Sequence, residues 1–154
     1  MLSLSSRYLK KVLDNRNFKK ISFIDANKNL DNITELNLKN CLTININSFN
    51  EMSDNAFNIY IELINGIGGF FYTKNPVAKF NDPDIATNIK RKRIALNTGQ
   101  IKKIINIFDE KELNKAKRNY VQTYLPSTKW KIISTKFSRP LIYYLQTLYE
   151  KKNN

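Results

Sequence analysis

The sequence predicts an α+β protein, with a mixed N-terminal half of short strands and one long helix and a basic C-terminal half that is mainly helical. Over residues 42–49 apolar and polar side chains alternate, which is typical of a half-buried strand. After residue 52 apolar side chains recur every three or four positions in several segments, which indicates amphipathic helices. The chain has 154 residues, 42% hydrophobic and 25% charged, and is expected to fold as a globular protein.

In the N-terminal half we expect a basic helix, several short strands and one long helix. The first helix covers residues 7–14, where apolar side chains recur at helical spacing. Ser53 or Asp54 can cap a second helix that runs to about Asn65 and ends at Gly66. Strands are predicted at residues 21–24, 36–38, 42–49 and 69–72.

In the C-terminal half most of the predicted elements are helices. Prolines at 76 and 83 are expected to break the chain between the halves, because the residue before a proline avoids helical dihedrals. The last helix is inferred from Tyr144, Leu145 and Leu148, which stand at helical spacing after a proline suited to a first turn. Helices are predicted over residues 84–96, 98–108, 109–125 and from Pro140 onward, and one strand over 130–133.

Charge divides the chain into three parts. The whole chain carries +13, but residues 1–20 hold 6 basic residues and 1 acidic residue, a net of +5. Residues 21–77 hold 3 basic and 6 acidic residues, and residues 78–154 hold 17 basic and 6 acidic residues, a net of +11. We therefore expect a basic N-terminal helix or arm, an α+β part and a basic, mostly helical part, the last two able to form one compact unit. Such a concentrated positive field indicates a polyanionic partner.

The amino-acid usage points to an A+T-rich genome. Asn (22), Lys (20) and Ile (19) together fill 61 positions. Their codons are rich in A and T, so the gene is expected in an organelle or a virus, and part of the lysine excess reflects mutation. The segment 1–13 is Ser-rich, basic and amphipathic, like a mitochondrial transit peptide. We expect it to be retained as an arm, and the chain to be made inside the mitochondrion and to work in its matrix.

Several classes of function are not expected. The chain has no His and a single cysteine, Cys41, so it lacks the usual zinc ligands, an internal disulfide and the commonest general base. Its serines have no His to activate them, and its acidic residues form no tight constellation. No apolar run approaches the roughly 18 residues that span a bilayer. We therefore expect no enzyme, no metal, no cofactor, no small-molecule substrate and no transmembrane segment.

The principal candidate for a binding site is a run of four cations, Lys90–Arg93. On a helix four consecutive side chains spread around about 300°, so they cannot all face a core. Near phosphates each cation releases counterions, although a solvated run or a localisation signal is the alternative interpretation. The predicted RNA-binding residues are Lys90, Arg91, Lys92, Arg93, Lys102, Lys103, Lys115, Lys117, Arg118, Lys129, Lys131, Lys136 and Arg139.

Two further features could contribute to such a site. Tyr124, Trp130 and Phe137 stand among the last of these cations, where aromatic rings could stack bases, although Trp130 in a strand is more often a core residue. Gly66 and Gly68 form a turn after a helix that could offer backbone N–H groups to a phosphate, unless Gly66 simply ends the helix.

Two short motifs resemble ribosomal proteins. The helix ending in residues 62–68 and the later segment 97–104 resemble the small-subunit head protein that contains a helix-hairpin-helix. The match covers under a third of the chain, and residues 69–72 read as a strand where that family has a second helix. Residues 136–139 look like part of a motif of another head protein. The resemblance implies a ribonucleoprotein role.

Together these observations predict a structural, rRNA-binding component of a mitochondrial ribosome. Its basic C-terminal half would neutralise rRNA phosphates, while the acidic middle part would meet neighbouring proteins of the assembly. Two alternatives stay open at this point. One is a DNA-binding accessory protein of an A+T-rich virus or plasmid. The other is a structural subunit of a mitochondrial membrane complex.

Overall fold

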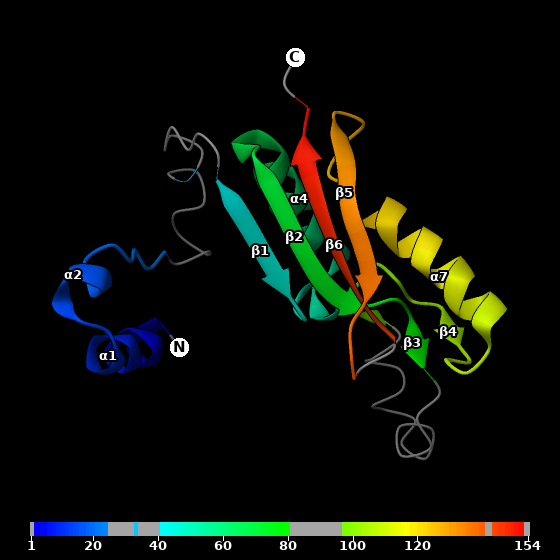
Figure 1. The fold of residues 1–154 in the computed structure, drawn as a ribbon, viewed down its shortest axis with the longest axis horizontal. Coiled ribbons are helices and arrows are strands. Elements are labelled where there is room, and N and C mark those ends of the chain that lie inside the picture. Colours follow the sequence, from blue (N-terminus) through cyan, green and yellow to red (C-terminus); the bar gives the residue numbers. More distant parts are fainter. Residues whose placement is uncertain (1, 25–32, 34–40, 81–96, 141–142, 153–154) are drawn as a thin grey trace. The chain divides into compact units, whose positions relative to one another are not determined.

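The computed structural model describes residues 2–24, 33, 41–80, 97–140 and 143–152. The chain forms two compact units, Met1–Asn37 and Leu38–Asn154. Each unit is described by itself below, and Figure 1 shows the elements of both.

Over residues 2–24 the first unit forms the helices α1 (Leu2–Val12) and α2 (Asn15–Phe18). Asp14 caps α2, because its carboxylate accepts hydrogen bonds from the backbone N–H (2.9 Å) and the side-chain amide (2.7 Å) of Asn17. These bonds lower the pKa of the Asp14 carboxyl below its usual value. The strand predicted at residues 21–24 is not formed.

The second unit is built on a four-stranded mixed sheet in the order β1-β2-β6-β5. β1 lies parallel to β2, while β2 with β6 and β6 with β5 are antiparallel. The helix α4 leads from β1 to its parallel neighbour β2. The strands are β1 (Leu42–Ile46), β2 (Phe70–Pro76), β5 (Trp130–Phe137) and β6 (Tyr144–Lys151).

Two long helices, α4 (Asp54–Ile67) and α7 (Glu110–Thr123), lie on one side of this sheet, as Figure 1 shows. Ser53 caps α4 by accepting the N–H of Ala56, and Gly68 with φ 79° ends it. Asp109 caps α7 by accepting two backbone N–H groups. Both helices begin where side-chain oxygens can replace the missing intrahelical acceptors. The predictions of these two helices are confirmed, except that α4 does not end at Gly66 but continues to Ile67.

The core lies between the helices and one face of the sheet. Alternate residues of the central strands are buried there, among them Phe71, Leu145 and Tyr149. The rings of Phe71 and Tyr149 stack with centroids 5.7 Å apart. Further buried residues of this core are Phe49, Phe57, Ile64, Val77, Ile101, Ile105, Ala116, Tyr120, Tyr124 and Trp130.

Shorter elements close one end of the unit. The 3-10 helix η1 (Phe49–Glu51) follows β1, and the strands β3 (Lys79–Phe80) and β4 (Ile104–Ile105) form a parallel pair. The backbone N–H of Lys79 donates to the carbonyl of Lys103 (2.9 Å), which is one of the hydrogen bonds that hold this parallel pair together.

The prediction of a mainly helical C-terminal half is wrong. The chain is α+β, but its C-terminal half contains two long strands. β5 covers residues 130–137 and includes the strand predicted over 130–133, and β6 covers residues 144–151, where a helix was expected from Pro140 onward. Strand β6 lies between two partner strands, so pairing with β2 and β5 satisfies the whole length of its backbone. Residue 141 of that expected helix lies outside the described part of the chain.

The prediction of a helix over residues 98–108 is also wrong. Ile101 and Ile105 are buried as helical spacing would require, but residues 98–108 form bends, a turn and, at Ile104–Ile105, the strand β4. Gly99, with φ 71°, instead donates its N–H to the carbonyl of Met52 (2.7 Å). The helix predicted over 84–96 and the strand predicted over 36–38 lie outside the described residues.

A candidate nucleic-acid interface on α7

The exposed side of α7 carries a row of three cations. Lys111, Lys115 and Arg118 stand four and three residues apart, so they line one side of the helix. All three are exposed, whereas Ala116 and Tyr120 on the opposite side are buried in the core. We call Lys111, Lys115 and Arg118 the α7 cationic stripe. Along the helix axis the stripe covers about 10 Å, from the rise of 1.5 Å per residue.

No carboxylate neutralises this stripe within the described part of the chain. The two ion pairs found there join Lys102 to Asp54 and Lys131 to Glu150, and neither involves α7. Glu112, three residues before Lys115 in α7, accepts the backbone N–H of Asn106 (2.9 Å). The positive charge of the stripe is therefore directed into solvent.

An exposed aromatic ring adjoins the start of α7. The side chain of Phe108 is 85% exposed, although large apolar side chains usually avoid water. Its position is held by a hydrogen bond from its backbone N–H to the side-chain oxygen of Asn106 (3.0 Å). Asp109, the cap of the helix, follows directly, so the ring precedes Lys111 by less than one turn. An exposed aromatic residue thus stands three positions before Lys111, the first residue of the α7 cationic stripe.

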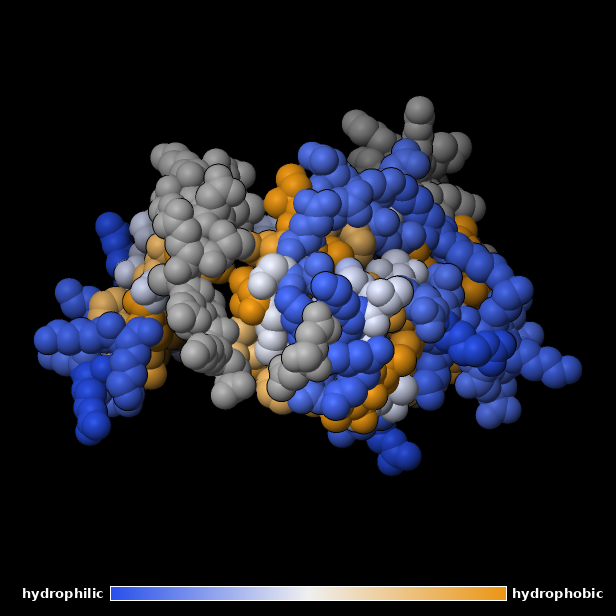
Figure 2. All heavy atoms as spheres, turned by 90° about the horizontal axis from the view of Figure 1, so that it is seen from above, coloured by the Kyte–Doolittle hydropathy of each residue, from blue (hydrophilic) through white to orange (hydrophobic). Residues whose placement is uncertain are grey.

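Strand β5 supplies further cations. It forms one edge of the sheet, since it pairs with β6 alone. Lys129, Lys131, Lys136 and Arg139 are exposed along or beside it. The Lys131 ammonium lies 2.7 Å from the Glu150 carboxylate, so its charge is partly neutralised. In Figure 2 much of the surface on the side where α7 lies is blue, the colour of hydrophilic residues.

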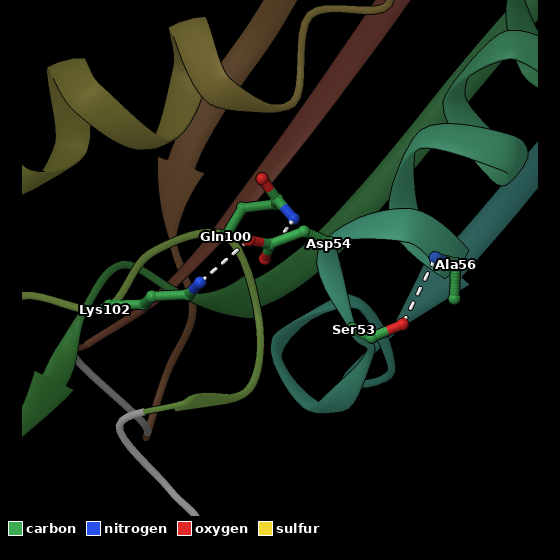
Figure 3. A network of polar contacts seen from close by, with 5 residues as sticks. All are labelled: Ser53, Asp54, Ala56, Gln100 and Lys102. Atoms are coloured by element: carbon green, nitrogen blue, oxygen red, sulfur yellow. Dashed lines mark hydrogen bonds and ion pairs between the residues drawn. The ribbon is translucent and has the colours of Figure 1, made fainter.

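Two of the predicted cations have mainly structural contacts. Lys102 donates to Asp54 (2.9 Å), and Gln100 donates to the other oxygen of the same carboxylate (3.0 Å). Figure 3 shows how this pair ties the segment before β4 to the first turn of α4, next to the Ser53 cap. Lys117 is half-buried, with its ammonium 5.6 Å from the centre of the Phe137 ring. Lys103 is exposed.

The other residues that the sequence suggested for a binding site are the aromatic residues and glycines, and the run Lys90–Arg93. Tyr124 and Trp130 are buried at 0% and 2% exposure, so they are core residues and cannot stack bases. Gly66 lies within α4, and Gly68 is buried and gives its N–H to the carbonyl of Ile64 (3.0 Å). The end of a helix where carbonyls project is unfavourable for an anion. The run Lys90–Arg93 lies outside the described residues.

Sequence reasoning missed two residues of this interface, Phe108 and Lys111. Phe108 is the last residue of the segment 98–108, for which a helix was predicted that the structure does not form. Lys111 could have been found, because the spacing of Lys111, Lys115 and Arg118 on a correctly predicted helix already places them in one row.

The described residues offer few other chemistries. Among them no three His, Cys, Asp or Glu side chains come together in a way that could hold a metal ion. None of the described helices combines the length and the apolar character needed to cross a membrane. Comparison with protein-family models, with curated proteins and with solved structures finds no match to this chain.

Proposed function

We propose that this protein is a structural RNA-binding component, with no reaction of its own, and that the α7 cationic stripe is a contact with RNA phosphates. The observation that supports the proposal is the stripe itself. Its three cations point away from the core, and no carboxylate among the described residues pairs with them. Cations held in this way attract a phosphate backbone and gain free energy from counterion release.

RNA is favoured over other polyanions by the ring beside the stripe. Single-stranded bases stack on exposed aromatic side chains while nearby Lys and Arg follow the phosphates. Phe108, 85% exposed and just before the helix cap, meets that requirement. Lys103, Lys129, Lys136 and Arg139 extend the positive surface, and Lys90–Arg93 would add to it.

The assembly proposed is the mitochondrial ribosome, with rRNA as the ligand. This narrower part of the proposal rests on the sequence, namely on the A+T-rich codon usage, on the net +11 of residues 78–154 and on the two motifs that resemble ribosomal head proteins. In such a particle the protein would act in the matrix by neutralising phosphates. Its less basic surfaces would contact neighbouring proteins.

The test measures how RNA affinity depends on salt. The triple variant Lys111→Gln, Lys115→Gln and Arg118→Gln removes the stripe, and we compare it with the full wild-type chain on labelled single-stranded RNA. For single strands the slope of log affinity against log salt changes by about 0.7 per phosphate contact, so the variant should lose about 2 from the slope. A matched control removes the same charge from α1 by Arg7→Gln, Lys10→Gln and Lys11→Gln.

The outcomes separate the alternatives. The proposal predicts that the α7 variant loses affinity and slope, while the α1 variant keeps most of both. Equal losses in the two variants would mean that general basicity, rather than this surface, holds the RNA. Preference of the wild-type chain for duplex DNA over RNA would reject the RNA assignment and favour a DNA-binding accessory protein.

A further inference from the structure

Helix α1 exposes a row of apolar side chains. Leu4, Tyr8 and Val12 stand four residues apart and are 71%, 64% and 54% exposed. Residues spaced in this way lie above one another on a helix. Leu9 and Leu13, which continue the apolar side, are half-buried. A helix of 11 residues thus leaves a continuous apolar surface in water, which is unfavourable unless a partner covers it.

The opposite side of α1 is cationic. Arg7, Lys10 and Lys11 are exposed, and α1 contains no acidic residue. At 100° per residue Lys11 falls beside Leu4, so the cations border the apolar row along one flank. The first carboxylate after the helix, Asp14, is engaged in capping α2 through both of its oxygens. The helix therefore combines an apolar row with three cations that no described residue neutralises.

We infer that α1 binds the surface of an anionic phospholipid membrane, lying in the plane of the interface. An amphipathic helix with Lys and Arg along its polar side buries its apolar side at the boundary of headgroups and acyl chains. The cations would meet lipid phosphates, and the phenol of Tyr8 suits the same depth because it joins an apolar ring to a polar group. RNA would engage the cations but leave the apolar row exposed. This inference concerns a surface other than the α7 cationic stripe and is independent of the proposed function.

Sedimentation of the full chain with vesicles tests the inference. The chain should co-sediment with vesicles of phosphatidylcholine mixed with phosphatidylglycerol, and far less of it should co-sediment with vesicles of pure phosphatidylcholine. The variant Leu4→Gln, Val12→Gln should weaken binding to the anionic vesicles at least about tenfold, because two apolar side chains no longer enter the interface. The matched control, Leu42→Gln with Ile46→Gln, changes two comparably exposed residues of β1 and should bind as wild type.

Charge is tested with the two triple variants defined above. Each cation near an anionic surface contributes about fivefold in affinity, so the α1 triple variant should lose on the order of a hundredfold. The α7 triple variant, with the same net charge, should lose much less. Equal losses would overturn the inference, and so would failure of the wild-type chain to sediment with anionic vesicles, which would point instead to a protein partner for α1.

A reporter within the helix provides a second readout. The single tryptophan, Trp130, is 2% exposed in the second unit and gives a constant background. A Tyr8→Trp variant places a second indole in the apolar row, and its emission should shift to shorter wavelength when anionic vesicles are added. An unchanged spectrum in the presence of bound vesicles would show that this side of α1 stays in water and would overturn the inference.

Discussion

Replacing Tyr120 with Phe is expected to destabilise the protein, whereas the same change at Tyr124, one turn later in sequence, is expected to be neutral or stabilising. The hydroxyl of Tyr120 accepts the backbone N–H of Asn75 (3.0 Å) and shares a hydrogen bond with Thr73 (3.2 Å). All these groups are buried at 0% exposure. The hydroxyl of Tyr124 is buried as well but has no hydrogen-bond partner among the residues that the structure describes.

The magnitude follows from the groups that each change leaves behind. Without the Tyr120 hydroxyl, the N–H of Asn75 is buried and unsatisfied, which costs about 1–3 kcal/mol. Thr73 is less affected, because it still accepts the side-chain amide of Asn75 (2.8 Å). Removing the Tyr124 hydroxyl leaves no described group unpaired and abolishes the cost of burying that hydroxyl, so its effect should lie between zero and a gain of about 1 kcal/mol.

Urea unfolding of the two variants and the wild-type chain measures this difference. The two changes remove the same atom from tyrosines that are both buried in the core, so each serves as the control for the other. Equal free energies of unfolding for the two variants would refute the reasoning, because the hydrogen bonds of Tyr120 would then contribute nothing. A larger loss at Tyr124 would refute it as well.

Other expected outcomes use the same stability and binding assays. Phe108→Ala should lower affinity for single-stranded RNA about tenfold, the contribution of one stacked base, and leave the salt slope unchanged; a changed slope would contradict stacking. Burial raises the pKa of Tyr120 from 10.0 to about 12, so in this pH range the folded state keeps a proton that the unfolded chain loses. The free energy of unfolding, measured by urea titration, should therefore fall as pH rises from about 10 towards 12. A free energy of unfolding that does not change over this range would contradict the prediction. Gly69→Ala should strongly destabilise the folded protein, because Gly69 has φ 74° and a Cβ there would lie 2.4 Å from a backbone carbonyl oxygen. Gly66→Ala, inside α4, should instead raise the free energy of unfolding by about 0.5–1 kcal/mol and should not weaken RNA binding. Changing Lys90–Arg93 to Gln should flatten the salt dependence of RNA binding without lowering the urea midpoint, and an unchanged slope would remove that run from the contact surface.

Helices with local signals could be predicted from the sequence. Ser53 and Asp109 each precede an amphipathic segment, and both cap the helix expected there. Capping and helical spacing involve residues three or four positions apart, so a single sequence contains the whole signal. The strands predicted over residues 42–49, 69–72 and 130–133 overlap β1, β2 and β5, although the bounds differ. The first of them could be predicted because apolar and polar residues alternate along it.

The last strand could not be predicted for a physical reason. In β6 the residues facing the core are Leu145, Thr147 and Tyr149, so a polar residue interrupts the expected apolar alternation. Thr147 is tolerated there because its hydroxyl bonds to that of Thr135 (3.2 Å), across a strand pairing that the sequence does not reveal. The remaining apolar residues of β6 happen to fit helical spacing. Long-range pairing therefore decided this element.

The candidate interface was foreseen only in part. Lys115 and Arg118 were predicted from the sequence to bind RNA, and both are exposed in the structure, as such a role requires. It could not show that Lys102 is tied to Asp54, because those residues are far apart along the chain. It also could not show that the Trp130 indole donates to the side chain of Asn65 (2.9 Å) and is thereby fixed in the core.

Photochemical crosslinking of the full chain to single-stranded RNA tests the central claim most directly. Ultraviolet irradiation of the complex, digestion and mass spectrometry would identify the peptides that carry nucleotides. The account predicts crosslinks in the segment that contains Phe108 and the α7 cationic stripe, and their loss in the triple variant of the stripe. Crosslinks confined to other segments, and unchanged in that variant, would contradict it.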